Sequence, residues 1–188
     1  MCKQLPDLKN LVNSIALHNT QKEYKKLFDL LFPSLYRFAY SLLKSKEQAE
    51  EVASDVMIAL WYDRQTLIHI ENIKVYAFVI ARNKSLNILK KQARQEIIAL
   101  DDIDIELVLN APTPEQILIN DELKEKLESA VQSLPSKCKL VFKLVKEEGL
   151  SYKETAEILK ISVKTVDAHL VTAVKKLACC LQIEFNLA

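Results

Sequence analysis

The scarcity of glycine limits what this chain can fold into. The chain has 188 residues and a single glycine, Gly149, whereas glycine usually makes up about 7% of a protein. Phosphate-binding loops and tight β-hairpins need glycine at fixed positions, because their backbones adopt positive φ. Hydrophobic residues account for 49% and charged residues for 27%, so the chain can bury a core. We therefore expect an all-α fold without a glycine-based nucleotide site.

Charge is distributed unevenly along the chain, although the net charge is only +1. Residues 1–98 carry 15 Lys and Arg against 10 Asp and Glu, and residues 123–188 carry 11 Lys against eight acids. Between them, residues 99–122 carry seven acids and no basic residue. Within this stretch, the segment 99–114 ends in two prolines, and Thr113-Pro114 is typical of a helix start. We predict two small helical bundles, with one domain over 1–97, an acidic linker over 98–113 and a second domain over 114–188.

The first domain shows helical spacing of apolar residues throughout. We expect helices over 21–31 and 35–43, separated at Pro33, and a third helix that a capping box at Ser45–Gln48 opens and that runs to about Trp61. A polar stretch over 62–72 follows. Asn72 then caps a long helix that extends to about Arg94.

The helix over 73–94 has two distinct faces. Its apolar stripe should face the core and consists of Val75, Phe78, Val79, Leu86, Leu89 and Ala93. Arg82 falls on this stripe, so we expect it to pair with a buried acid, Asp55. The adjoining face is polar and basic and consists of Tyr76, Asn83, Lys84, Asn87, Lys90, Lys91 and Arg94. This composition suits contacts with nucleic acid, with Tyr76 either stacking on an unpaired base or serving as a half-buried structural residue.

The second domain has the pattern of a helix-turn-helix. A helix over 134–148 should end at Gly149, because glycine readily adopts the left-handed backbone conformation that ends many helices. A capping box at Ser151–Glu154 opens a short helix to about Leu159, and Ser162 caps a final helix from Val163. That helix carries an apolar stripe of Val163, Val166, Leu170, Val174, Leu177 and Leu181.

Opposite this stripe, the final helix carries small, polar and cationic residues: Lys164, Thr165, Ala168, Thr172 and Lys175, with His169 and Lys176 on the flank. Small residues near a helix N-terminus let the backbone lie deep in the major groove, and lysines further along reach phosphates. An isolated helix with such a face is more often simply solvated. The short capped helix and tight turn before it favour DNA recognition, against which Asp167 is a mild objection.

The cysteines and histidines show no metal-ligand spacing, and we expect no cofactor or metal. Cys2, Cys138, Cys179 and Cys180 are typical of reduced thiols. A thiol nucleophile at Cys138 with His169 as base would lack an orienting group and an oxyanion loop, so we do not expect an enzyme or a small-molecule substrate. The chain also lacks a secretory signal and an apolar run of about 20 residues, which indicates a cytoplasmic protein without direct membrane insertion.

Several segments resemble the sigma-70 family. The segments 28–40 and 49–61 are similar to its regions 2.1 and 2.2, and the segment 76–91 is similar to regions 2.3–2.4. Leu134-Pro135, 148–157 and 161–170 resemble region 4. The spacer is too short for region 3, which is typical of the extracytoplasmic-function (ECF) group. Thr155 stands where this family usually has isoleucine.

The resemblance implies roles for these residues. Region 2 of such factors contacts the β′ clamp helices of RNA polymerase, here through Glu50, Glu51, Asp55 and Trp61. It also captures an unpaired base of the −10 element, using the 62–72 loop and the start of the helix over 73–94, and the polar face of that helix supplies the −10 DNA-binding residues. Region 4 contacts the −35 element, here through residues 164–176, and docks on the β flap. An anti-sigma factor is a common further partner.

Three other interpretations remain open from the sequence. A helix-turn-helix regulator with a sensing N-terminal domain would be favoured by a sheet bearing an acidic phosphoacceptor pocket. A sigma-like decoy would bind an anti-sigma protein without promoter activity. A small helical thiol enzyme would depend on Cys138 or His169.

Overall fold

The computed structural model describes residues 8–18, 20–93, 103, 105 and 129–180, and every regular element in these ranges is helical. The all-α prediction is confirmed. The chain divides into two units, Met1–Glu96 and Ile97–Ala188. Most of the predicted linker over 98–113 lies outside the described residues, so its boundaries stay a prediction. No helix within the described ranges is long and apolar enough to cross a membrane.

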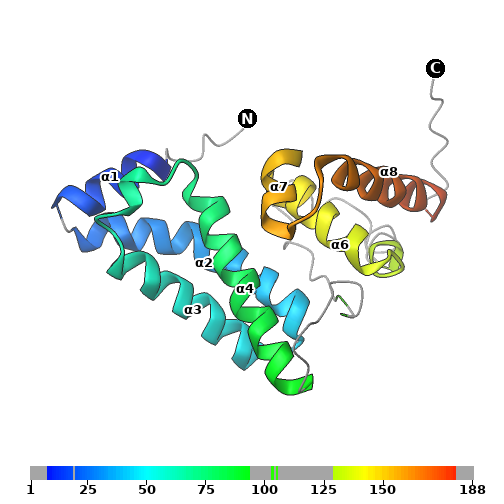
Figure 1. Ribbon diagram of the computed structural model, residues 1–188, viewed down its shortest axis with the longest axis horizontal. Coiled ribbons are helices and arrows are strands. Elements are labelled where there is room, and N and C mark those ends of the chain that lie inside the picture. Colours follow the sequence, from blue (N-terminus) through cyan, green and yellow to red (C-terminus); the bar gives the residue numbers. More distant parts are fainter. Residues whose placement is uncertain (1–7, 19, 94–102, 104, 106–128, 181–188) are drawn as a thin grey trace, which may run out of the picture. The chain divides into compact units, whose positions relative to one another are not determined.

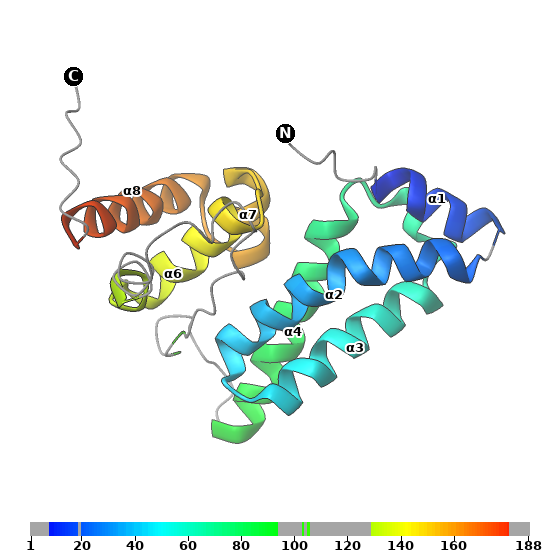
Figure 2. The same cartoon turned by 180° about the vertical axis from the view of Figure 1, so that it is seen from behind.

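The first unit contains α1 (Leu8–His18), α2 (Gln21–Leu43), α3 (Lys46–Tyr62), the short 3₁₀ helix η1 (Leu67–His69) and α4 (Ile73–Ala93). α2, α3 and α4 pack against one another, and α1 packs on α2 and η1 (Figures 1 and 2). Phe38 and Phe78 are fully buried at the centre, with ring centroids 5.1 Å apart in an edge-to-face arrangement. Such pairs add to the stabilisation that burial alone provides.

α2 runs unbroken through Pro33, so the predicted separation into two helices is wrong. A proline inside a helix removes one backbone hydrogen bond and costs about 3 kcal/mol. Here the apolar positions on both sides of Pro33 lie on the same stripe, and Leu27, Leu31 and Leu35 are all buried. Packing of this stripe on α3 and α4 offsets the local cost, and Pro33 itself is exposed.

The helix starts of the first unit follow the predicted caps. Ser45 Oγ accepts a hydrogen bond from the Gln48 backbone N–H at 3.3 Å, and Asn72 Oδ1 accepts one from the Val75 N–H at 3.1 Å. Of the predicted core stripe of α4, Val75, Phe78 and Leu86 are buried, Val79 and Leu89 are half-buried and Ala93 is exposed, whereas Ala81 and Ser85 are buried without having been predicted. Ser85 is tolerated there because its hydroxyl donates to the Ala81 carbonyl at 2.8 Å.

The second unit contains a helical turn at 129–132, α6 (Ser136–Phe142), the π-helical segment η3 (Lys143–Glu147), α7 (Tyr152–Leu159) and α8 (Val163–Cys180). α6 and α7 both pack on α8. The predicted helix over 134–148 begins at Ser136, and its last turn widens into η3. There the Lys143 side chain is fully buried and lies 3.0 Å from the Glu147 carboxylate.

The turns between these helices form as predicted. Gly149 has φ +69°, and the Leu150 N–H donates to the Leu144 carbonyl at 3.0 Å, which closes the end of η3. Ser151 and Glu154 form a complete capping box, and Ser162 Oγ accepts from the Thr165 N–H at 3.0 Å. Lys160 takes the left-handed conformation at the end of α7 with φ 56°, where glycine is the usual residue.

The buried stripe of α8 is narrower than predicted. Val166, Leu170 and Leu177 are buried, and Ala173 joins them. Val163 and Val174 are 47% and 37% exposed. Leu181 lies outside the described residues.

Two residues of the acidic segment are buried in the second unit. Ile103 and Ile105 are 6% and 1% exposed. The Lys139 ammonium, itself buried, donates to the Ile105 carbonyl at 2.9 Å. At Ile105 this segment is therefore joined to α6 by a charge-assisted hydrogen bond.

Candidate nucleic-acid interface

One face of α8 presents the residues that the sequence predicts for DNA contact. The exposed members are Lys164, Ala168, Thr172, Lys175 and Lys176, and the half-buried members are Thr165 and His169. The Ser162 cap and the turn at Lys160 fix the start of this helix, and α7 packs beside it. A capped helix after a tight turn, with exposed small and cationic residues near its start, has the form of a recognition helix.

Two hydroxyls on this face hydrogen-bond locally. Thr172 Oγ1 donates to the Ala168 carbonyl at 2.8 Å, and the Thr165 and Ser162 hydroxyls lie 2.7 Å apart. A hydroxyl that donates in this way keeps acceptor lone pairs. The face can therefore accept from base amino groups as well as present lysines to phosphates.

His169 contacts a buried thiol beneath this face. Its Nδ1 lies 3.6 Å from Cys138 Sγ, on α6. Desolvation by burial raises the pKa of the Cys138 thiol, and the charge of nearby Lys176 opposes the rise only in part. A neutral, buried thiol is a poor nucleophile. The contact therefore links α6 to α8 and does not resemble an activated cysteine.

The polar face of α4 is only partly free for contacts. Tyr76, Asn83, Lys84 and Lys90 are half-buried, while Asn87 and Lys91 are exposed. Arg94 lies outside the described residues. Lys84 forms an ion pair with Asp55 of α3, with 2.7 Å between Nζ and Oδ2.

The predicted pair of Arg82 with Asp55 is therefore wrong. Asp55 faces the polar side of α4, two residues further along, where Lys84 meets it. Arg82 instead donates from Nη1 to Asn83 Oδ1 at 3.2 Å, and its Nε is buried without a partner. Burial lowers the pKa of the Arg82 guanidinium, which still remains charged near neutral pH.

The exposed face of α3 combines acids with apolar residues. Glu50 and Glu51 are exposed, and Trp61 is half-buried between Tyr24, at a ring distance of 4.8 Å, and the Arg64 guanidinium, 4.8 Å from its ring. Ile58 and Tyr62 are 52% and 76% exposed on the same side of the helix. These two residues were not among those predicted to bind the clamp, although helical spacing places them beside Glu51 and Asp55.

No three His, Cys, Asp or Glu side chains in the described ranges are grouped so that they could hold a metal ion. The described residues that the sequence predicts for DNA and polymerase contacts lie on the α8 face, the α4 face and the α3 face.

Two family models match the chain, one on each unit. The model of sigma-70 region 2 matches residues 27–95, and the model of sigma-70 region 4 matches residues 124–177. The chain belongs to the sigma-70 family. Its curated relatives place it in the ECF group, which confirms the resemblance.

Two of these relatives come from Bacillus subtilis (strain 168). The ECF RNA polymerase sigma factor SigM is 26% identical over 137 residues, which cover 73% of this chain and 82% of SigM. The ECF RNA polymerase sigma factor SigW is 22% identical over 157 residues, which cover 80% and 84% of the two chains.

A solved structure shares the fold of this sigma factor. The sigma factor RpoE from Bartonella quintana, in complex with the anti-sigma factor NepR, has a TM-score of 0.62 at 23% identity. The match covers 87% of this chain and 99% of RpoE. It supports the assignment of the helical fold.

Proposed function

We propose that this chain binds core RNA polymerase and directs it to a subset of promoters for transcription initiation. The observation that supports this function is the match of sigma-70 regions 2 and 4, in family order, to the two separate units. The curated relatives are named as RNA polymerase sigma factors. The chain itself catalyses nothing in this proposal and needs no cofactor or small-molecule substrate.

The second unit contacts the −35 element as duplex DNA. α8 enters the major groove with Lys164, Thr165, Ala168 and Thr172, while Lys175, Lys176 and His169 lie toward the backbone. The exposure of the lysines on a capped helix supports this role. Phosphate contacts position such a helix, and base-edge contacts select the sequence.

The first unit captures unpaired DNA at the −10 element. The polar face of α4, with Tyr76, Asn83, Asn87, Lys90 and Lys91, lines the path of the strand together with the 62–72 loop. Contacts that form only with unstacked bases offset the free energy of melting. Lys84 contributes less to DNA binding than the sequence suggests, because its ion pair with Asp55 already neutralises its charge.

The exposed face of α3 binds the β′ clamp helices. To the predicted residues Glu50, Glu51, Asp55 and Trp61 we add Ile58 and Tyr62, because a protein interface combines exposed apolar area with charge at its rim. The second unit docks on the β flap. We further propose that the protein acts in the cytoplasm, where core polymerase is found, and that an anti-sigma factor holds it there when it is inactive.

Two binding assays separate this function from its alternatives. Purified protein is mixed with bacterial core RNA polymerase, and association is measured by co-purification. Retention of genomic promoter fragments is then compared for core alone, for the chain alone and for the mixture. We expect retention of specific fragments only by the mixture. Specific retention by the chain alone would indicate an ordinary helix-turn-helix regulator, and core binding without retention would indicate a promoter-inactive decoy.

A further inference from the structure

The contact between Cys138 and His169 joins the core of the second unit to the α8 face. Cys138 lies on α6 and is only 3% exposed, and its Sγ lies 3.6 Å from Nδ1 of His169 on α8. The imidazole is half-buried. One nitrogen of this ring therefore meets a buried thiol, although the residue lies at the edge of the surface proposed to contact DNA.

His169 shares one side of α8 with two residues of the α8 face. At about 100° per residue, Thr165 and Lys176 lie within about 40° of His169 around the helix axis. Lys176 is exposed, and its charge acts on the Cys138 thiol, which places the ammonium near the contact. A phosphate that Lys176 attracts therefore lies close to the imidazole.

The direction of the hydrogen bond between thiol and ring follows from burial. Burial raises the pKa of the Cys138 thiol, which keeps its hydrogen at neutral pH. If Sγ–H donates to Nδ1, the buried hydrogen is bound and the ring hydrogen lies on Nε2. If Nδ1–H donates to sulfur, a weak acceptor, the thiol hydrogen loses this acceptor inside the core. The first arrangement satisfies the buried groups better.

The position of the ring hydrogen decides how a neutral His169 meets DNA. The two nitrogens point in different directions from the ring, so Nε2 points away from the thiol. Phosphate oxygens accept hydrogen bonds and do not donate them. Nε2–H therefore binds a phosphate, whereas an Nε2 lone pair is repelled by one.

We propose that the Cys138 thiol donates to Nδ1 of His169 and so keeps the ring hydrogen on Nε2, from which His169 donates to a phosphate beside the −35 element. Cys138 is then a positioning residue that acts on DNA only through His169. The inference rests on the proposed function where it concerns DNA, whereas the state of the ring belongs to the free chain.

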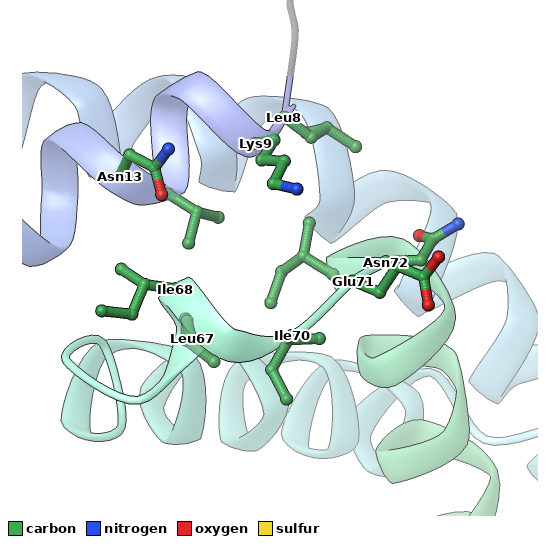
Figure 3. A pocket seen from close by; sticks show the side chains of 10 residues that line it. Leu8, Lys9, Asn13, Leu67, Ile68, Ile70, Glu71 and Asn72 are labelled. Atoms are coloured by element: carbon green, nitrogen blue, oxygen red, sulfur yellow. The ribbon is translucent and has the colours of Figure 1, made fainter.

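His69 in the first unit offers an internal comparison. It lies in η1 between Ile68 and Ile70, which line a cavity of about 400 Å³ between α1 and the loop that precedes α4 (Figure 3). His69 itself does not line this cavity, and it is exposed. Its ring should therefore exchange between the two neutral tautomers as an imidazole in water does.

Nitrogen-15 NMR of the free, full-length chain tests the state of the ring without DNA or polymerase. The chemical shifts of the ring nitrogens distinguish a protonated nitrogen from one with a lone pair. Spectra are recorded above the usual imidazole pKa of about 6.5, where the ring is neutral. The signals of His169 are identified by their loss in His169→Gln. We expect a larger fraction with the hydrogen on Nε2 for His169 than for His69.

Three cysteine variants show whether the thiol is the cause. Cys138→Ala should make the tautomer ratio of His169 approach that of His69. Cys138→Ser, which keeps a hydrogen-bond donor, should retain part of the preference. Cys179→Ala, which removes an exposed thiol from α8, is the matched control and should leave the ratio unchanged.

Binding of holoenzyme to a −35 duplex tests the contact with DNA. We expect His169→Ala to weaken binding about tenfold, as the loss of one hydrogen bond to a charged group would. Cys138→Ala should weaken it about two- to threefold, because the ring is no longer held. When His169→Ala is already present, Cys138→Ala should have no further effect, since the thiol acts through the ring.

Four results would overturn the proposal. The state of the ring is wrongly assigned if the hydrogen lies on Nδ1, or if His169 and His69 have the same tautomer ratio. Equal losses from Cys138→Ala with and without His169 would mean that the thiol acts only on the stability of the fold. No loss from His169→Ala would mean that the ring does not meet DNA. A holoenzyme that binds no promoter, with the expected NMR result, would instead contradict the proposed function.

Discussion

Lys84 on α4 and Asp55 on α3 form an ion pair in which Nζ and Oδ2 lie 2.7 Å apart. The two residues belong to different proposed surfaces, the first to the DNA face and the second to the polymerase face. Their charges neutralise each other between the two helices. Each surface therefore depends more on its remaining residues than the sequence suggests.

Breaking this pair should change stability only slightly. Both side chains are more than a third exposed, at 38% and 47%, and such pairs contribute about 0–1 kcal/mol. We predict that Asp55→Asn lowers the free energy of unfolding by at most about 1 kcal/mol, measured by urea denaturation, and that high salt removes most of the difference. Glu50→Gln, an exposed acid on the same helix, is the control. A loss that persists in high salt would show that the pair is structural.

Substitutions on the α8 face should weaken binding to duplex DNA without weakening association with core polymerase. Lys164→Ala removes a positive charge, and Thr172→Ala removes a hydroxyl that bonds within its own helix. Alanine has the higher helix propensity, so the threonine change should not destabilise α8. We predict weaker binding of holoenzyme to the −35 element with unchanged association to core polymerase. Equal loss of both activities would argue against the assignment of this face.

The α4 face should act on melted DNA. We predict that Asn83→Ala and Lys91→Ala reduce open-complex formation about five- to thirtyfold, as a loss of one to two kcal/mol implies. Binding to closed duplex promoter should change much less. Permanganate reactivity of −10 thymines measures the opening, and wild-type reactivity in both variants would contradict this role.

Replacing the hydroxyl of Thr155 with a methyl group should stabilise the protein. Its side chain is fully buried and its Oγ1 has no hydrogen-bond partner. A buried unsatisfied hydroxyl costs about 1–3 kcal/mol. Thr155→Val keeps the shape of the side chain and should raise the free energy of unfolding by about 1 kcal/mol in urea denaturation. Thr172→Val, at an exposed position, should give no such gain, and a loss at Thr155 would show that its hydroxyl is satisfied.

The thiol of Cys138 should be unreactive in the folded protein. Burial raises its pKa, so the thiolate fraction at neutral pH falls below that of an ordinary cysteine and recovers only at higher pH. Cys179 is exposed. We predict that iodoacetamide modifies Cys179 much faster than Cys138 at pH 7, measured by peptide mass spectrometry, and that denaturant removes the difference. Comparable rates in the folded protein would reopen the thiol-enzyme interpretation.

Local signals in the sequence located most helix ends but not the tertiary partners. Asn72, Ser151 and Ser162 cap where predicted, because capping depends on a few neighbouring residues. The continuity of α2 through Pro33 could not be read locally, since it depends on packing against α3 and α4. The same holds for Asp55, which pairs with Lys84 and not with Arg82.

In the candidate site too, helical spacing predicts which residues are exposed but not which side chains meet across helices. Helical spacing correctly placed the exposed lysines of α8, because the opposite stripe is buried. The sequence raises Cys138 and His169 together only as a thiol-and-base interpretation, whereas their contact at 3.6 Å depends on the packing of α6 on α8. No periodicity within one helix predicts such contacts.

Run-off transcription tests the sigma-factor function most directly. Purified chain and bacterial core RNA polymerase are incubated with a genomic promoter pool, and core alone serves as the control. We predict new transcripts with defined start sites that appear only in the mixture and share −35 and −10 sequences. Tight association with core and no transcript from any promoter would contradict promoter-directing activity.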